Sequence, residues 1–120
     1  MKILVVEDDD INIEILEHAF IVQDFKYFVA KNATEGLRQI KLEKFDVILL
    51  DLMLPDMSGH EFLTKIRNMG FATPVIITSA CADTENKVKG FKNMADDYLV
   101  KPFDEVELIC RMCIQVRHKV

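Results

Sequence analysis

The sequence is poor in several residue types that mark particular protein classes. It contains no tryptophan, and only three cysteines, three prolines and four glycines occur among its 120 residues. The cysteines, Cys81, Cys110 and Cys113, are odd in number and clustered late, unlike the framework of a small secreted fold, so we expect free thiols. No apolar run approaches the roughly 20 residues of a membrane span, and none at the N-terminus is long enough for a signal peptide. We therefore expect a cytoplasmic protein that does not bind membranes.

The sequence also lacks an excess of basic residues over acidic ones. The chain has 15 lysine and arginine residues against 20 aspartate and glutamate residues, for a formal net charge of -5. A protein that grips the phosphate backbone of DNA shows a basic face, so we expect no direct DNA binding by this chain. The hydrophobic share of 50% and the charged share of 29% are those of a globular protein, and the length suits one domain.

Short runs of branched apolar residues alternate with segments whose apolar residues recur every three or four positions. The predicted strands cover residues 3–6, 27–30, 46–50, 75–78 and 98–100. A predicted helix follows each strand, with apolar stripes within residues 11–20, 33–40, 62–66, 88–91 and 106–116. This alternation predicts an α/β fold, a doubly wound (βα)5 arrangement with a five-stranded parallel sheet and helices on both faces.

Polar residues that could carry chemistry follow four of these strands. Glu7 and Asp8 follow the first strand, Asp51 the third, Ser79 the fourth and Lys101 the fifth. In open parallel sheets, ligands bind beyond the carboxyl ends of the strands. We therefore expect carboxylates, a hydroxyl and an amine to meet at one edge of the sheet.

Crowded carboxylates repel one another unless a cation or a shared proton is present, and oxygen ligands without histidine favour Mg²⁺. Asp51 interrupts an apolar run, where a buried, unpaired carboxylate would be costly. Beside a metal it could act as a nucleophile toward phosphorus, while Ser79 and Lys101 could bind phosphoryl oxygens. The alternative for the acidic run at residues 7–10 is helix capping, in which Asp9 or Asp10 accepts amide hydrogen bonds.

Four ordered motifs resemble the receiver domain of bacterial two-component response regulators over essentially the whole chain. The motifs are Val5-Val6-Glu7-Asp8-Asp9, Asp51-Leu52-Met53-Leu54-Pro55 with Gly59, Ile77-Thr78-Ser79-Ala80, and Asp96-Asp97-Tyr98-Leu99-Val100-Lys101-Pro102-Phe103. The resemblance implies a flavodoxin-like (CheY-like) fold, with residues 1–120 as a single receiver domain and any output domain beyond this chain. It also implies that Asp51 accepts phosphate from a sensor histidine kinase.

The resemblance further implies a set of groups that hold Mg²⁺. These groups are Glu7, Asp8, Asp51 and the backbone carbonyl of Met53. Glu7 stands where many relatives have aspartate, and its longer side chain favours a contact to the metal through water.

Three more residues receive roles from the resemblance. Ser79 would be the switch hydroxyl, Tyr98 the aromatic side chain that rotates with it, and Lys101 the amine that contacts the acyl phosphate. The bond between Lys101 and Pro102 would be cis. The chain would then be a regulatory phospho-acceptor with only weak self-phosphorylation and autophosphatase chemistry, and not an enzyme.

The C-terminal third resembles the receivers of OmpR/PhoB-like winged-helix transcription factors. In that branch the fourth helix, fifth strand and fifth helix form a symmetric dimer on phosphorylation. The resemblance implies that Lys87 pairs with Glu107, and Asp97 with Arg111, across this dimer. It also implies transcription control, with DNA contacted only by an output domain outside this chain. The alternative is a stand-alone receiver that acts as an adapter through protein contacts.

Several residues depart from this pattern or bear on other functions. Met94 stands where relatives usually have glycine, and Cys113 where they often have a basic residue. Cys110 and Cys113 have redox spacing, but inside the last helix we expect them to be packing residues. A phosphatase would need a general acid two residues after Asp51, and Met53 cannot donate a proton. A flavin-binding module would not carry four acids after its first strand, because they would repel the cofactor phosphate.

Overall fold

The computed structural model describes residues 1–117 and contains strands and helices in strict alternation. The strands are β1 (Lys2–Val6), β2 (Lys26–Ala30), β3 (Val47–Leu50), β4 (Val75–Ser79) and β5 (Asp97–Val100). The helices are α1 (Asp10–Val22), α2 (Ala33–Leu42), α3 (Gly59–Asn68), α4 (Thr84–Lys92) and α5 (Glu105–Arg117). The strands pair in parallel in the order β2-β1-β3-β4-β5. The predicted doubly wound (βα)5 fold is confirmed.

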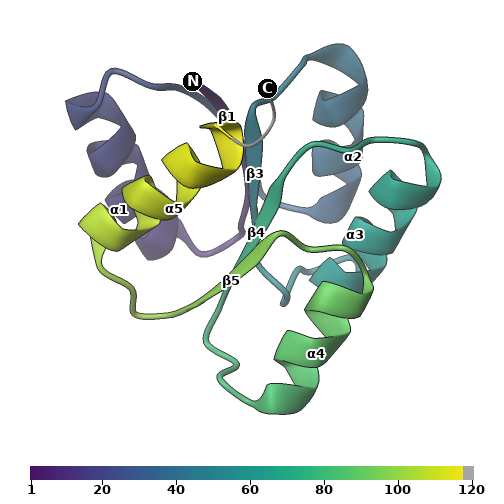
Figure 1. Ribbon diagram of the computed structural model, residues 1–120. Helices are drawn as coiled ribbons and strands as arrows, with labels where there is room; N and C mark the ends of the chain where they lie inside the picture. The colour runs from purple at the N-terminus through teal and green to yellow at the C-terminus, as the bar shows by residue number, and fades with distance from the viewer. Residues whose placement is uncertain (118–120) are drawn as a thin grey trace.

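The helices cover both faces of the sheet, and each face has its own hydrophobic core (Figure 1). Helices α1 and α5 lie on one face, and α2, α3 and α4 lie on the other. Neighbouring residues of a strand point to opposite faces, so Ile3 and Val5 of β1 pack under α1 and α5 while Leu4 and Val6 join the other core. Every residue of β3 is buried, which places the end of this strand at the centre of the molecule. No helix of residues 1–117 is both long and apolar enough to span a bilayer.

Side chains just before the helices satisfy backbone amides of the first turns. Asp9 accepts a hydrogen bond from the amide of Ile11 at 3.1 Å, so the capping hypothesis is right for this acid. Asp83 caps α4 in the same way through the amide of Asn86 at 2.9 Å. The capping role of Asp9 leaves Glu7 and Asp8 available for another function.

Two sequence-based expectations need correction. Ser79 is the last residue of β4 and not the first residue after it. Cys110 and Cys113 are exposed, although we expected packing residues. The reason is that α5 buries only Leu108 and Met112, which are one turn apart, so the cysteines fall on the outer side of the helix. All three cysteines are free, as predicted.

Helix α4 ends in a left-handed turn at a residue that is not glycine. Met94 has a φ of 72°, and its side chain is 65% exposed. The turn lets the amide of Ala95 donate to the carbonyl of Gly90, which closes the helix. The guanidinium group of Arg67 donates to the carbonyl of Met94 at 2.9 and 3.1 Å and holds the turn in place. A residue with a Cβ is disfavoured in this conformation, so glycine would suit this position better than methionine.

We expect Met94→Gly to raise the free energy of unfolding by about 0.5 to 1 kcal/mol, because the strain of the left-handed conformation disappears. Met69→Gly is the matched control, since Met69 also ends a helix and is partly exposed but has a φ of -79°. There the added glycine should lower stability by about 0.5 kcal/mol. Urea unfolding of both variants measures the difference, and a shift of the same sign in both would contradict this explanation.

Candidate metal and phosphoryl-acceptor site

Three carboxylates meet where β1 and β3 end side by side. The amide of Asp51 donates to the carbonyl of Val6 at 3.0 Å, which continues the pairing of the two strands past their ends. One carboxylate oxygen from each of Glu7, Asp8 and Asp51 lies within 4.8 Å of the other two. Glu7 is 2% exposed and Asp51 8% exposed, whereas Asp8 is open to solvent. The cluster is therefore a buried pair of acids with one exposed acid at its entrance.

The predicted amine completes this cluster. Lys101 follows β5, and its backbone amide donates to the carbonyl of Ser79 at 2.7 Å. Its ammonium group forms an ion pair with the carboxylate of Glu7, and Nζ lies 3.5 Å from Oδ2 of Asp51. The peptide bond between Lys101 and Pro102 is cis, as predicted. One ammonium group thus faces three carboxylates, which leaves the site short of positive charge.

Burial raises the pKa of Glu7 to about 7, and the hydrogen bond and negative charge of nearby Asp51 act in the same direction. The ammonium group of Lys101 opposes this rise but does not cancel it. The amide of Asp8 also donates to Oε2 of Glu7 at 3.1 Å. A divalent cation would favour the charged form of such a carboxyl. An all-oxygen donor set with a negative excess fits Mg²⁺, which usually keeps several waters.

The loop after β3 turns back on Asp51. The amide of Met53 donates to Oδ1 of Asp51 at 3.3 Å, which brings its backbone to the cluster while its side chain is 71% exposed. Gly59 begins α3 against this loop, and its amide donates to the carbonyl of Leu52 at 2.7 Å. A Cβ at Gly59 would lie 2.4 Å from the carbonyl oxygen of Asp51. Only glycine therefore lets α3 start against the backbone of Asp51.

Asp56 is a second anchor of this loop and was not among the residues predicted from the sequence. The carboxylate of Asp56 accepts hydrogen bonds from the amides of Ala33 and Thr34, at 2.8 and 2.9 Å, and from the Thr34 hydroxyl at 2.7 Å. These bonds, the hydroxyl bond foremost, lower the pKa of Asp56 to about 2. Asp56 thereby ties the loop that follows Asp51 to the start of α2. No local pattern reveals the contact, because Asn32 already forms an ordinary cap for this helix.

Ser79 and Tyr98 both contact the peptide groups of Cys81. Ser79 is 1% exposed, and its Oγ accepts a hydrogen bond from the amide of Cys81 at 3.1 Å. The hydroxyl of Tyr98 donates to the carbonyl of Cys81 at 2.6 Å. Both predicted switch residues therefore hold the loop between β4 and α4 (residues 80–83).

The residues assigned to a dimer lie on α4, β5 and α5. Arg111 donates to the carboxylate of Asp97 at 2.9 and 3.0 Å and to Oε1 of Glu107 at 3.0 and 3.1 Å, all within one chain. No ion pair between Lys87 and Glu107 occurs within the described part of the chain. The structure thus brings three of the four residues together inside the monomer.

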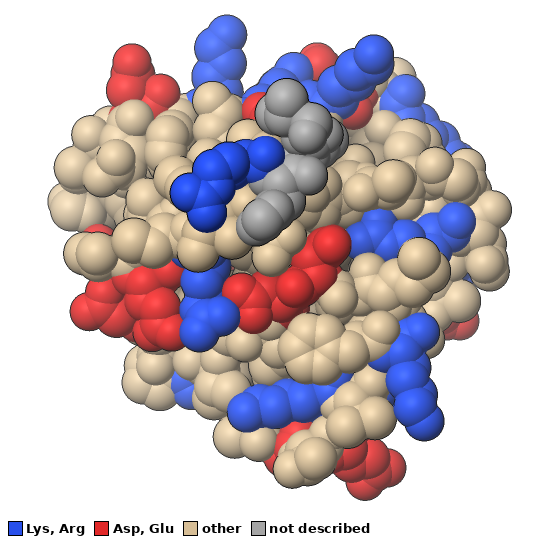
Figure 2. Space-filling view, in the orientation of Figure 1, with Lys and Arg blue, Asp and Glu red and all other residues tan. Residues whose placement is uncertain are grey.

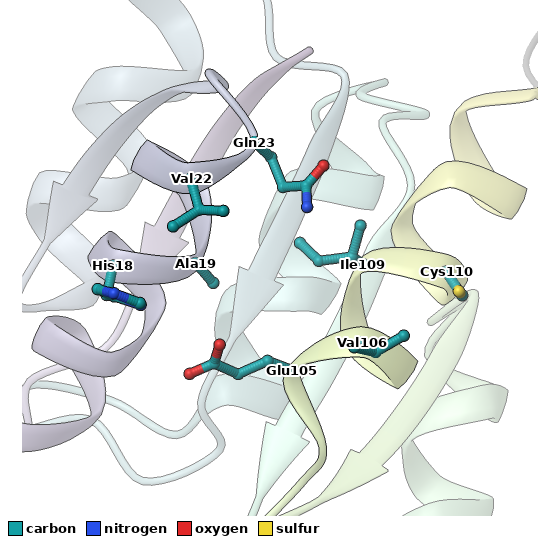
Figure 3. Close-up of a pocket in the computed structure, with 8 residues that line it drawn as sticks. All are labelled: His18, Ala19, Val22, Gln23, Glu105, Val106, Ile109 and Cys110. Carbon is teal, nitrogen blue, oxygen red and sulfur yellow. The ribbon is translucent and has the colours of Figure 1, made fainter.

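A separate hollow of about 260 Å³ lies between α1 and α5 (Figure 3). Ala19 and Val22 of α1 and Val106 and Ile109 of α5 make it largely apolar, and Cys110 stands at its α5 side. Its lining includes no member of the carboxylate cluster. It is therefore distinct from the candidate metal site.

The raised pKa of Glu7 predicts a pH-dependent stability of the metal-free protein. A folded-state pKa of about 7, above the ordinary value of 4.5, means that the folded protein binds more protons between these pH values. Stability should therefore fall as the pH rises through this window. In EDTA, Glu7→Gln should remove this fall, so that the variant gains about 1 to 3 kcal/mol relative to wild type between pH 4.5 and 8.

Urea unfolding at several pH values measures this gain, and the same series with Mg²⁺ is the control. With Mg²⁺ the fall in wild-type stability should shrink, because a bound cation favours the charged carboxyl. Parallel pH profiles of wild type and Glu7→Gln in EDTA would show that Glu7 does not carry the effect.

The chain matches known proteins along nearly its whole length. Residues 3–112 match the family model of the response regulator receiver domain. The cell cycle response regulator CtrA of Brucella ovis is 41% identical over 117 residues, a match that covers 98% of this chain and 50% of CtrA. The chain thus spans about half the length of the curated relatives it matches.

Solved structures agree with this match. The receiver domain of the Francisella response regulator 1452 is 38% identical with a TM-score of 0.94, over 99% of this chain and 98% of that one. A receiver domain of a Pseudomonas aeruginosa sensor histidine kinase, which holds a magnesium ion in its active site cleft, is 26% identical with a TM-score of 0.88. That match covers 96% of each chain. The fold, the matched family model and the identity to CtrA together place the chain in the receiver domain family of response regulators.

Proposed function

We propose that this receiver domain is a phospho-acceptor switch in which Asp51 takes a phosphoryl group from a sensor histidine kinase. The observation that carries the proposal is the buried carboxylate of Asp51, which lies 3.5 Å from the ammonium group of Lys101 beside two further acids. In the transfer, an oxygen of Asp51 forms a bond to phosphorus while the bond from phosphorus to the kinase histidine breaks. Lys101 would stabilise the charge on the phosphoryl oxygens.

Mg²⁺ is part of the proposal. Glu7, Asp8, Asp51 and the backbone carbonyl of Met53 would hold the ion, and Glu7 would do so through water because Lys101 already pairs with it. The bound ion would neutralise charge on the transferring group.

Ser79 and Tyr98 would convert phosphorylation into a change of shape. The hydroxyl of Ser79 accepts a hydrogen bond from the amide of Cys81 and keeps its own proton to donate, so moving toward a phosphoryl oxygen on Asp51 would pull Cys81 along with it. The hydroxyl of Tyr98 donates to the carbonyl of Cys81, so Tyr98 would respond to any movement of the loop between β4 and α4. Movement would thus spread to the face formed by α4, β5 and α5.

We expect incubation with acetyl phosphate and Mg²⁺ to add the mass of one phosphoryl group to the intact protein. Asp51→Asn should abolish this gain, because an amide oxygen is a poor nucleophile, and EDTA should suppress it in wild type. Asp56→Asn is the matched control, since this nearby acid is engaged in capping α2. Intact-mass spectrometry gives the result; a gain in Asp51→Asn, or a full gain in EDTA, would disprove the assignment.

The identity to CtrA supports a further proposal about output. The chain corresponds to about half of that regulator, so we propose an OmpR/PhoB-type regulator in which residues 1–120 are the single receiver domain. DNA would be contacted only by an output domain outside this chain, and the protein would act in the cytoplasm. A stand-alone adapter that signals through protein contacts remains the alternative.

A phosphorylation-dependent homodimer through α4, β5 and α5 is the corresponding proposal for assembly. Figure 2 shows acidic and basic side chains interleaved across the middle of this face. Arg111 is already paired with Asp97 inside the chain, so a partner subunit would share or exchange an existing ion pair. Exposed ion pairs contribute only about 0 to 1 kcal/mol, so they would set the alignment of the dimer more than its strength.

We expect beryllofluoride with Mg²⁺ to shift the wild-type protein toward a dimer in sedimentation velocity. Arg111→Glu should weaken the dimer by at least about tenfold, because a third acid beside Asp97 and Glu107 adds repulsion on both subunits. Arg38→Glu is the control, since Arg38 pairs with Glu35 on α2, away from this face. A wild type that stays monomeric with the phosphate mimic would contradict the proposed dimer.

A further inference from the structure

His60 is a buried imidazole that the proposed chemistry does not use. It is the second residue of α3 and is 6% exposed. Its Nε2 lies 3.1 Å from Oδ1 of Asn86 on α4, while Nδ1 is buried without a hydrogen-bond partner within residues 1–117. A buried polar atom without a partner is uncommon and calls for an explanation.

The hydrogen bonds around Asn86 determine which ring nitrogen of His60 donates to it. The amide nitrogen of Asn86 donates to both carboxylate oxygens of Asp83, at 2.9 and 3.1 Å. Its oxygen therefore faces His60, and an amide oxygen can only accept a hydrogen bond. His60 must donate from Nε2, which leaves the buried Nδ1 as the atom without a partner. A chain of hydrogen bonds thus runs from His60 through Asn86 to Asp83.

These hydrogen bonds connect the start of α3 to the loop between β4 and α4, which moves in the proposed switch. Gly59, next to His60, packs against the backbone of Asp51, so the start of α3 is fixed relative to the proposed acceptor. Asp83, at the other end, caps α4 and ends the loop whose Cys81 is held by Ser79 and Tyr98. The loop is therefore tethered at Cys81 and again at Asp83.

We infer that His60 is a positioning residue that holds the loop between β4 and α4 in its resting arrangement, through its hydrogen bond to Asn86. This inference rests on the proposed function, because it assumes that Ser79 moves toward Asp51 and carries Cys81 with it when a phosphoryl group binds Asp51. A loop that moves with Ser79 displaces Asp83 and Asn86 and stretches the bond to His60. The bond favours the resting state over the activated state, so its loss shifts the equilibrium toward the activated state.

A double-mutant cycle with beryllofluoride as phosphoryl mimic tests the inference. Isothermal titration calorimetry at saturating Mg²⁺ gives the beryllofluoride affinity of wild type, Asn86→Ala, His60→Leu and the double variant. Asn86→Ala should bind beryllofluoride about 3- to 10-fold more tightly than wild type, because it removes the bond to His60 that favours the resting state, whereas the bonds that it also removes to Asp83 lie within one turn and favour neither state. In the His60→Leu background the same substitution should change the affinity less than about twofold, because the bond is already absent.

Three controls separate this role from a merely structural one. Binding of Mg²⁺ alone should not change, since neither substitution touches the carboxylate cluster. His60→Gln should retain the wild-type response to Asn86→Ala, because its amide nitrogen can donate to Asn86. Thr84→Ala, in the same first turn of α4, should leave the beryllofluoride affinity unchanged.

Equal effects of Asn86→Ala in the wild type and in the His60→Leu variant would overturn the inference. If His60→Leu does not fold, the Asn86→Ala variant alone tests the inference. The Asn86 side chain is only half-buried, so we expect this variant to fold. An unchanged or weaker affinity of this variant for beryllofluoride would overturn the inference. Failure of the proposed function looks different, since the wild type would then bind beryllofluoride no better than Asp51→Asn does.

Discussion

The excess of negative charge at the carboxyl edge of the sheet is the constraint on which the proposed function depends. The strands β1 and β3 are neighbours, so Glu7 and Asp51 are forced together, and Asp8 adds a third carboxylate at the entrance. Lys101 supplies one ammonium group, and the pKa of Glu7 stays raised in spite of it. A site built in this way favours cations and groups that bring cations with them.

The surrounding fold holds these like charges in place. Every residue of the strand before Asp51 is buried, and the backbone amide of Asp51 is fixed by the hydrogen bond that it donates to the carbonyl of Val6. Gly59 and Asp56 then secure the loop that follows, one by close backbone contact and the other by capping α2. Burying carboxylates close together is energetically unfavourable. Packing elsewhere in the fold offsets this unfavourable free energy.

The sequence predicted the parts of this arrangement that depend on strand order and on apolar periodicity. Asp51 and Lys101 were found because parallel strands place their carboxyl ends at one edge, and the elements followed from alternation of apolar patterns. Contacts between distant loops could not be found in this way. Asp56 contacts Thr34 of α2, which is 22 residues away in the sequence. His60 contacts Asn86 of α4, which is 26 residues away. Neither contact produces a local sequence pattern. The exposed side of α5 was misjudged at Cys110 because small apolar residues occur on both sides of a surface helix.

Charge also explains why phosphorylation would act on the loop after β4 and not on the rigid core. A phosphoryl group carries about -1.5 to -2 charges near neutral pH, so adding it to Asp51 increases the negative charge even when a divalent cation is bound. The new oxygens require donors, and Lys101, which also pairs with Glu7, can satisfy only some of them. A further donor is the hydroxyl of Ser79, whose bond to Cys81 uses its oxygen as acceptor and leaves its proton to be donated elsewhere. Recruiting that proton would draw Ser79 toward Asp51 and strain the two tethers of the loop, at Tyr98 and at Asn86. In the proposed switch, the hydroxyl of Ser79 would therefore carry the signal, because it would donate to the phosphoryl group while still accepting from the loop.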